Sequence, residues 1–241
     1  MQDKNTLIPL STIFMRSFSG FVAGIAGSIV LGIVIILSWS IVGDTLMGTG
    51  IEENEFGIAV DGNPTHPLFL SLVTLALFGA TLTTNLVFTF LTTVTEEKYS
   101  LRATTLTQVF FGNLAILFLS LPVYLIFSGL FGPEGIAVAG VFHAIITIIF
   151  TSFVLEILNS PKTILITLYG ILFALILFLF FGSMLIKANA SVLAFLTLPL
   201  LGCFMGGGTG LSEVFYNWIY RLYGVDFLNL KTRFGKDYGK E

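Results

Sequence analysis

The sequence predicts an all-α integral membrane protein, a polytopic bundle of about six transmembrane helices. Three observations support this prediction: a scarcity of charge, long uninterrupted apolar runs, and turn or charged residues between the runs. Charged residues make up 10% of the 241 residues and hydrophobic residues 55%, whereas about a quarter of the residues of a soluble domain are charged. Fourteen acids and eleven bases are too few to coat a soluble chain of this length, so lipid must cover most of its surface.

The apolar runs are long enough to cross a bilayer as helices. A transmembrane helix needs about 20 apolar residues, because each residue advances about 1.5 Å across a hydrocarbon core of about 30 Å. The runs continue for about twice the ten residues of a spanning β-strand and do not alternate with polar residues, which favours helices. The expected spans, which form a transmembrane domain over residues 1–212, are residues 18–42, 67–91, 106–127, 135–158, 163–185 and 191–211.

The distribution of basic residues predicts the orientation. With the N-terminus inside, ten of the eleven Lys and Arg residues fall on the cytoplasmic side and only Lys187 falls on the other, as the positive-inside rule requires. We therefore expect the protein in the cell (plasma) membrane with both termini in the cytoplasm. The ten residues are Lys4, Arg16, Lys98, Arg102, Lys162, Arg221, Lys231, Arg233, Lys236 and Lys240.

Apolar residues recur at helical spacing after the last expected span. Phe215, Trp218 and Leu222 share one face of a helix, and Arg221 lies on another. This pattern predicts an amphipathic helix in the inner membrane interface, continued by a basic cytoplasmic tail, over residues 213–241.

Polar side chains inside the apolar runs are the first candidate functional residues, because a polar group in lipid is unfavourable unless it has a partner or faces water. Asn85 and Asn113 lie at nearly the same depth in the second and third spans, and Gln108 and several threonines lie in the same half of the membrane. One interpretation is a polar pocket or the inner mouth of a solute path. The other is hydrogen bonding between helices, worth about 0.6–2 kcal/mol per bond, with threonines that bond their own helix.

His143 is the only histidine within an expected span, and it lies near the middle of the membrane. Such a side chain can relay protons or bind a substrate. The alternative is a neutral, hydrogen-bonded packing residue, since no carboxylate lies close to it in its own helix.

A glycine-rich stretch in the last span is a candidate helix break. It consists of Gly206, Gly207, Gly208 and Gly210, and each glycine lowers helix propensity by about 1 kcal/mol. An unwound segment there can turn carbonyls toward an ion, with Glu213 as a gate acid one turn beyond. The alternatives are close helix packing, or a bend into the interfacial helix, with Glu213 as a solvated residue.

Small residues also follow one face of the first span. Gly20, Gly24 and Gly27 recur at three- and four-residue spacing, which lets another helix approach closely. The partner is either a helix of the same chain or a second copy or partner membrane subunit.

Composition and motifs exclude several classes of function. The net charge of −3 argues against nucleic acid as a partner, and a single cysteine, Cys203, excludes an internal disulfide framework and any multi-cysteine metal site. We expect no cofactor and no catalytic residues, because no phosphate-binding loop or nucleophile motif occurs. The leading hypothesis is a small permease or transporter-like component for a small solute or ion. The alternative is a non-catalytic structural or assembly subunit of a membrane complex, and an intramembrane enzyme ranks third.

Overall fold

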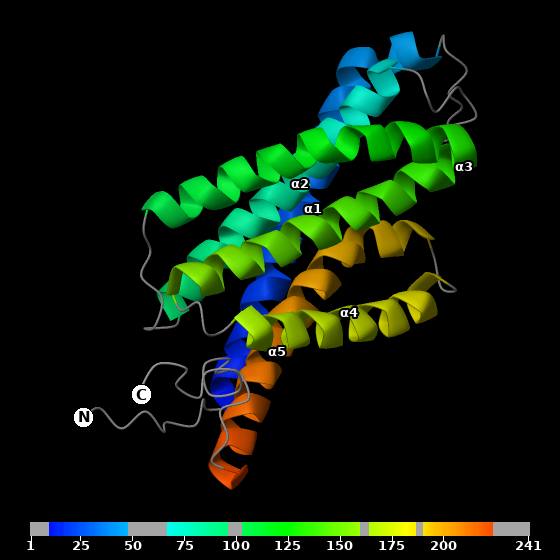
Figure 1. The fold of residues 1–241 in the computed structure, drawn as a ribbon. Helices are drawn as coiled ribbons and strands as arrows, with labels where there is room; N and C mark the ends of the chain where they lie inside the picture. Colours follow the sequence, from blue (N-terminus) through cyan, green and yellow to red (C-terminus); the bar gives the residue numbers. More distant parts are fainter. Residues whose placement is uncertain (1–9, 48–66, 96–102, 160–163, 187–189, 224–241) are drawn as a thin grey trace, which may run out of the picture.

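The computed structural model describes residues 10–47, 67–95, 103–159, 164–186 and 190–223, and all of them are helical. Figure 1 shows the helices packed side by side as one tilted bundle. In chain order they are α1 (Leu10–Met47), α2 (Pro67–Thr95), α3 (Ala103–Asn159), α4 (Ile164–Ile186) and α5 (Ala190–Tyr223). The part of the predicted basic tail after Tyr223 lies outside the described residues.

The long helix α3 is two antiparallel arms joined at one residue. Gly132 has φ 61° and ψ −142°, a conformation that glycine adopts at little steric cost. Pro133 follows it and suits the first position of a new helix, where its missing N–H is no loss. The first arm (residues 103–131) and the second arm (residues 133–159) therefore fold back on each other, as the two green segments of Figure 1 show.

With α3 counted as two arms, the bundle has the six helices that the sequence predicts. Five helical segments are long and apolar enough to cross a membrane: Ser11–Ser38, Ser71–Thr95, Thr105–Gly132, Val138–Leu155 and Phe195–Tyr216. The sixth helix, α4, has 23 residues and is about 35 Å long; its apolar described part is Thr167–Ser183. The prediction of an all-α polytopic membrane bundle is confirmed.

The helices pack in a definite order around α1 and α5. α1 lies between α5 and α2, α4 packs on α5, and the arms of α3 pack on α2. Small and aliphatic residues such as Ala80, Ala174 and Leu201 fill the core. Large apolar side chains cover the outside, for example Leu119 at 77% exposure and Leu130 at 70%. An apolar exterior around a tightly packed interior is what a lipid solvent favours.

α5 differs from the prediction at its C-terminal end. One unbroken helix runs from Ala190 to Tyr223, so residues 213–223 continue α5 and do not begin a separate helix. The amphipathic segment is the last part of α5, where Phe215 and Trp218 are exposed with ring centroids 5.9 Å apart.

Candidate polar site between α2 and the two arms of α3

Asn85 of α2 and Asn113 of the first arm of α3 are in direct contact inside the bundle. Asn85 Nδ2 donates a hydrogen bond to Asn113 Oδ1 over 2.7 Å, and Asn113 Nδ2 donates to the carbonyl oxygen of Val109 over 2.7 Å. The two asparagines are 1% and 0% exposed. The equal depth that the sequence indicates for them therefore corresponds to a real contact between two helices.

His143 lies on the second arm of α3 and contacts the first arm. Its Nδ1 is 2.9 Å from Ser120 Oγ, and its ring centroid is 6.1 Å from that of Tyr124. All three side chains are buried, with Tyr124 only 2% exposed. Sequence reasoning did not single out Ser120 or Tyr124. The available signal was spacing, because Ser120 and Tyr124 follow Asn113 on the same helical face.

Buried polar residues of α2 and α3 form three stripes, one on α2 and one on each arm of α3. Spacings of three, four, seven and eight residues keep each stripe along one side of its helix. The Asn85–Asn113 bond joins the first two stripes, and the Ser120–His143 bond joins the second and third. We call this set the polar column: Thr74, Thr81, Asn85, Thr89 and Thr92 on α2; Thr105, Asn113, Ser120, Tyr124 and Ser128 on the first arm; and His143, Thr147 and Thr151 on the second arm.

Most hydroxyls of the polar column are satisfied within their own helix. Thr81 donates to the carbonyl of Leu77, and Thr89 to that of Asn85. Threonine and serine commonly bond the carbonyl three or four residues earlier, and need no cavity to do so. Thr147, Thr151 and Ser128 follow the same pattern.

Four buried polar atoms among the described residues lack a hydrogen-bond partner. They are Asn85 Oδ1, Thr92 Oγ1, Tyr124 OH and His143 Nε2, and all four belong to the polar column. An unpaired polar atom is costly in a protein interior, and more so where the surrounding solvent is lipid. The described helices therefore do not supply every hydrogen-bond partner that the polar column requires.

Gln108 does not join the polar column, which corrects the sequence prediction. Its side chain is exposed on the outer face of α3. The physical reason is helical geometry: five residues rotate about 140° around the axis, so Gln108 and Asn113 face different directions.

The candidate helix break is also wrong, because α5 stays helical through Gly206, Gly207, Gly208 and Gly210. The glycines allow neighbouring helices to approach closely. A Cβ at Gly206 would overlap the carbonyl oxygen of Arg16 on α1, and a Cβ at Gly208 would overlap that of Gly170 on α4. Close packing on two sides of α5 compensates for the low helix propensity of glycine.

The small-residue face of α1 is filled by helices of the same chain. A Cβ at Gly20 would overlap the carbonyl oxygen of Gly202, and one at Gly24 would overlap Pro199, both on α5. Gly27 packs in the same way on Thr84 of α2. Helices of the same chain thus pack against this face at Gly20, Gly24 and Gly27.

Arg16 and Glu213 form a buried ion pair between α1 and α5. Arg16 Nη2 donates to Glu213 Oε2 over 2.9 Å, and the side chains are 3% and 19% exposed. The sequence indicated only that Arg16 is a cytoplasmic charge and Glu213 a gate acid or a solvated residue. The burial of Arg16 could have been predicted from its position, since it lies one turn before Gly20 on the small-residue face of α1.

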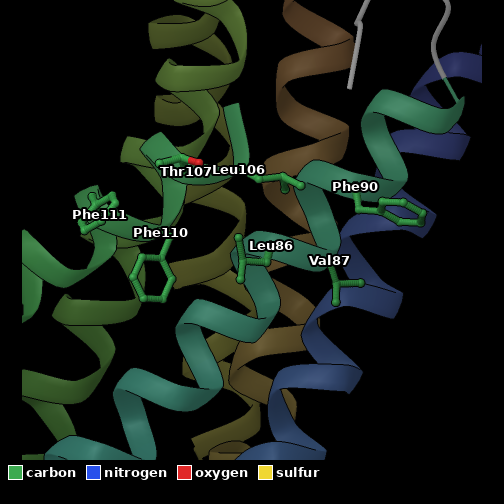
Figure 2. Close-up of a pocket in the computed structure, with 7 residues that line it drawn as sticks. All are labelled: Leu86, Val87, Phe90, Leu106, Thr107, Phe110 and Phe111. Carbon is green, nitrogen blue, oxygen red and sulfur yellow. The ribbon is translucent and has the colours of Figure 1, made fainter. Parts of the chain in front are cut away.

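A separate apolar groove of about 610 Å³ lies on the outer side of α2 and α3, and Figure 2 shows its lining side chains. It contains none of the polar-column residues, which are at most 9% exposed. The polar column is thus closed in this conformation, and the groove is a surface feature of the membrane-facing side. The groove is lined by Leu86, Val87, Phe90, Leu106, Thr107, Phe110 and Phe111.

No cluster of three or more His, Cys, Asp or Glu residues that could hold a metal ion occurs in the described parts of the chain. The polar column therefore offers hydrogen-bonding groups and one imidazole. The apolar helices identify the chain as an integral membrane protein, and no family model, curated protein or solved structure matches it.

Proposed function

We propose that this protein is a small permease or transporter-like component that moves a small solute or ion along the polar column. The observation that supports this proposal is the set of four unpartnered polar atoms, on all three stripes of the column. Helix packing alone does not explain why such atoms are buried in a membrane interior. A solute that forms hydrogen bonds with them would explain it. The proposal assigns no catalytic step to the chain.

The depth of the polar column fits a path across the membrane. Measured from the ends of α2 and α3 that lie nearest their connection, Thr92 is about 5 Å deep, Asn85 about 15 Å, Ser120 about 26 Å and Tyr124 about 32 Å. These depths cover the thickness of the hydrocarbon core, about 30 Å. Hydrogen-bonding groups are therefore available at every level that a solute would cross.

The experiment is solute flux in vesicles that contain the purified protein. Asn85→Leu and Asn113→Leu remove the amides that join α2 to α3, and we expect each variant to lower the flux at least tenfold. Thr83→Val is the matched control, because Thr83 lies on another face of α2, is only half-buried and bonds the carbonyl of Gly79. Flux that is unchanged in both asparagine variants would rule out this path.

A non-catalytic structural or assembly subunit is the second candidate, and one observation favours it. Every side chain of the polar column is buried, and several of its hydroxyls bond their own helix, as expected of residues that hold helices together. Asn113→Cys in a Cys203→Ala background separates the candidates. A transport path must open to water, so a small charged thiol reagent reaches Cys at position 113 in the first case and fails to reach it in the second.

We further propose that both termini face the cytoplasm in the cell (plasma) membrane, on the strength of the basic residues that gather at one side. Single cysteines in the Cys203→Ala background test this orientation in intact cells. A membrane-impermeant thiol reagent added from outside is expected to label positions 44–66 and to leave positions 231–241 unlabelled. The opposite pattern would reverse the orientation.

A further inference from the structure

We infer that the polar column binds hydrogen-bond donors, neutral or cationic, and disfavours anions. The inference rests on the proposed function for its consequence in transport. Its basis is the direction of the hydrogen bonds in the two networks that join the stripes. Each network starts at a backbone carbonyl of α3, which can only accept, and ends at an unpartnered atom.

The first network fixes the orientation of both asparagine amides. The Val109 carbonyl can only accept, so the group of Asn113 that lies 2.7 Å from it must be the Nδ2 donor. Asn113 Oδ1 therefore faces Asn85, and Asn85 donates its Nδ2–H to that oxygen. Asn85 Oδ1 is left at the end of this chain of bonds as a buried acceptor without a donor.

The second network assigns a tautomer to His143. Ser120 Oγ lies 2.9 Å from the carbonyl oxygen of Leu117 and 2.9 Å from His143 Nδ1, but a hydroxyl carries a single hydrogen. We assign that hydrogen to the Leu117 carbonyl, because Ser128 donates to the carbonyl of Leu125 in the same way. In this arrangement His143 donates Nδ1–H to Ser120 Oγ, and its unpartnered Nε2 keeps a lone pair.

In these two arrangements Asn85 Oδ1 and His143 Nε2 are both acceptors. The hydroxyls of Thr92 and Tyr124 can donate or accept a hydrogen bond. They therefore do not restrict which group binds. A group that brings N–H or O–H bonds satisfies Asn85 Oδ1 and His143 Nε2, whereas an anion meets two lone pairs in a medium of low dielectric constant. The donor is either a water molecule or the transported solute itself.

The tautomer is the direct test, and the chain suits it because it has only two histidines, His66 and His143. In the His66→Gln variant, ¹⁵N-labelled histidine in lipid nanodiscs gives signals from His143 alone. Long-range ¹H–¹⁵N correlations identify each ring nitrogen, and we expect hydrogen on Nδ1 and none on Nε2. Hydrogen on Nε2 in this protein would overturn the inference.

Ser120 is a positioning residue in this scheme, and Ser128 provides a matched control. Both serines are buried on the same face of the first arm and bond the carbonyl three residues earlier. Ser120→Ala is expected to release Nδ1 and shift the population toward the Nε2–H tautomer. Ser128→Ala is expected to leave the His143 signals unchanged, and equal shifts in both variants would contradict the role of Ser120.

Magnetisation transfer from water to the His143 ring distinguishes the two sources of the donor. Transfer in a solute-free sample identifies water, and transfer that appears only from added guanidinium identifies a solute. Contact with neither would contradict the inference, because no hydrogen-bond donor would then reach the Nε2 lone pair.

Flux of three planar probes of similar size then tests the consequence for transport. Guanidinium carries only donors, urea carries both donors and an acceptor, and nitrate carries only acceptors. We expect guanidinium or urea to enter the vesicles at least tenfold faster than nitrate, and His143→Phe to reduce this flux. Nitrate entry as fast as that of the other probes would overturn the selectivity. Absence of all flux together with the expected tautomer would contradict the proposed transport function and leave the acceptor site in place.

Discussion

The interface between α1 and α5 and the interface between α2 and α3 hold their helices together by different means. α1 and α5 meet backbone to backbone through glycines, as at Gly20 and Gly202, with one ion pair at the end. α2 and the arms of α3 meet through amides, hydroxyls and an imidazole. In lipid there is no hydrophobic force between helices, so close packing and hydrogen bonds must both contribute to association.

The two interfaces also differ in how far their buried polar atoms find hydrogen-bond partners. Four glycines between α1 and α5 leave no room for a methyl group, as expected of closely packed helices: Gly20, Gly24, Gly202 and Gly206. The polar column buries costly groups and still leaves four atoms without partners. A structural role explains the first interface fully, whereas the second contains more polarity than packing requires.

The largest effect is expected from breaking the ion pair of the α1–α5 interface. Arg16→Met leaves the Glu213 carboxylate without this partner in a largely buried position, which we expect to lower the free energy of unfolding by about 3 kcal/mol. Chemical unfolding in detergent micelles measures the change. Adding Glu213→Gln to Arg16→Met is expected to recover part of the loss, and a double variant as unstable as the sum of the single ones would contradict this explanation.

Gly202→Ala is expected to have the next largest effect. The added methyl group would overlap the carbonyl oxygen of Gly20, and forcing the two helices apart costs about 1–3 kcal/mol. Gly182→Ala is the matched control, because a Cβ at that position of α4 meets no atom within 4 Å. Thermal unfolding of the two variants should differ clearly, and equal stability would argue against the close-packed interface.

The Asn85–Asn113 contact is expected to contribute less than either feature of the α1–α5 interface. A double-mutant cycle with Asn85→Leu and Asn113→Leu should give a coupling energy of about 0.6–2 kcal/mol, the range for hydrogen bonds between membrane helices. The measurement is the free energy of unfolding of the four proteins. A coupling energy near zero would mean that the 2.7 Å contact does not hold the helices together.

Thr89→Val is expected to have the smallest effect. Thr89 is fully buried in the polar column, but its hydroxyl donates to the carbonyl of Asn85 in its own helix. Its loss should change the free energy of unfolding by less than about 1 kcal/mol. A larger loss would show that even the self-bonded hydroxyls join α2 to α3, and would favour the structural candidate.

Much of this fold could be predicted from the sequence because the membrane dictates the length and polarity of each helix. The Gly132-Pro133 turn separates two runs that are each long enough to span, and equal counting from a shared turn brings Asn85 opposite Asn113. These predictions need only helix geometry. They do not depend on how distant helices cross.

The remaining features depend on which helix face meets which neighbour. Gly206 lowers helix propensity in isolation, and only the presence of α1 beside it makes it a packing residue. Arg16 is a charge near a helix end until α5 places Glu213 against it. Tyr124 is buried because the turn of α3 at Gly132 brings the second arm, with His143, against it.

The contact between the first and the last helix has a consequence for biosynthesis. α1 leaves the ribosome first, yet the partner of Arg16 lies 197 residues later in the chain. Until α5 has been inserted, the glycine face of α1 and its arginine have no partner on that helix. The α1–α5 interface therefore forms only after α5 has been made, and a chain truncated before α5 would present an unfilled helix face to the insertion and quality-control machinery.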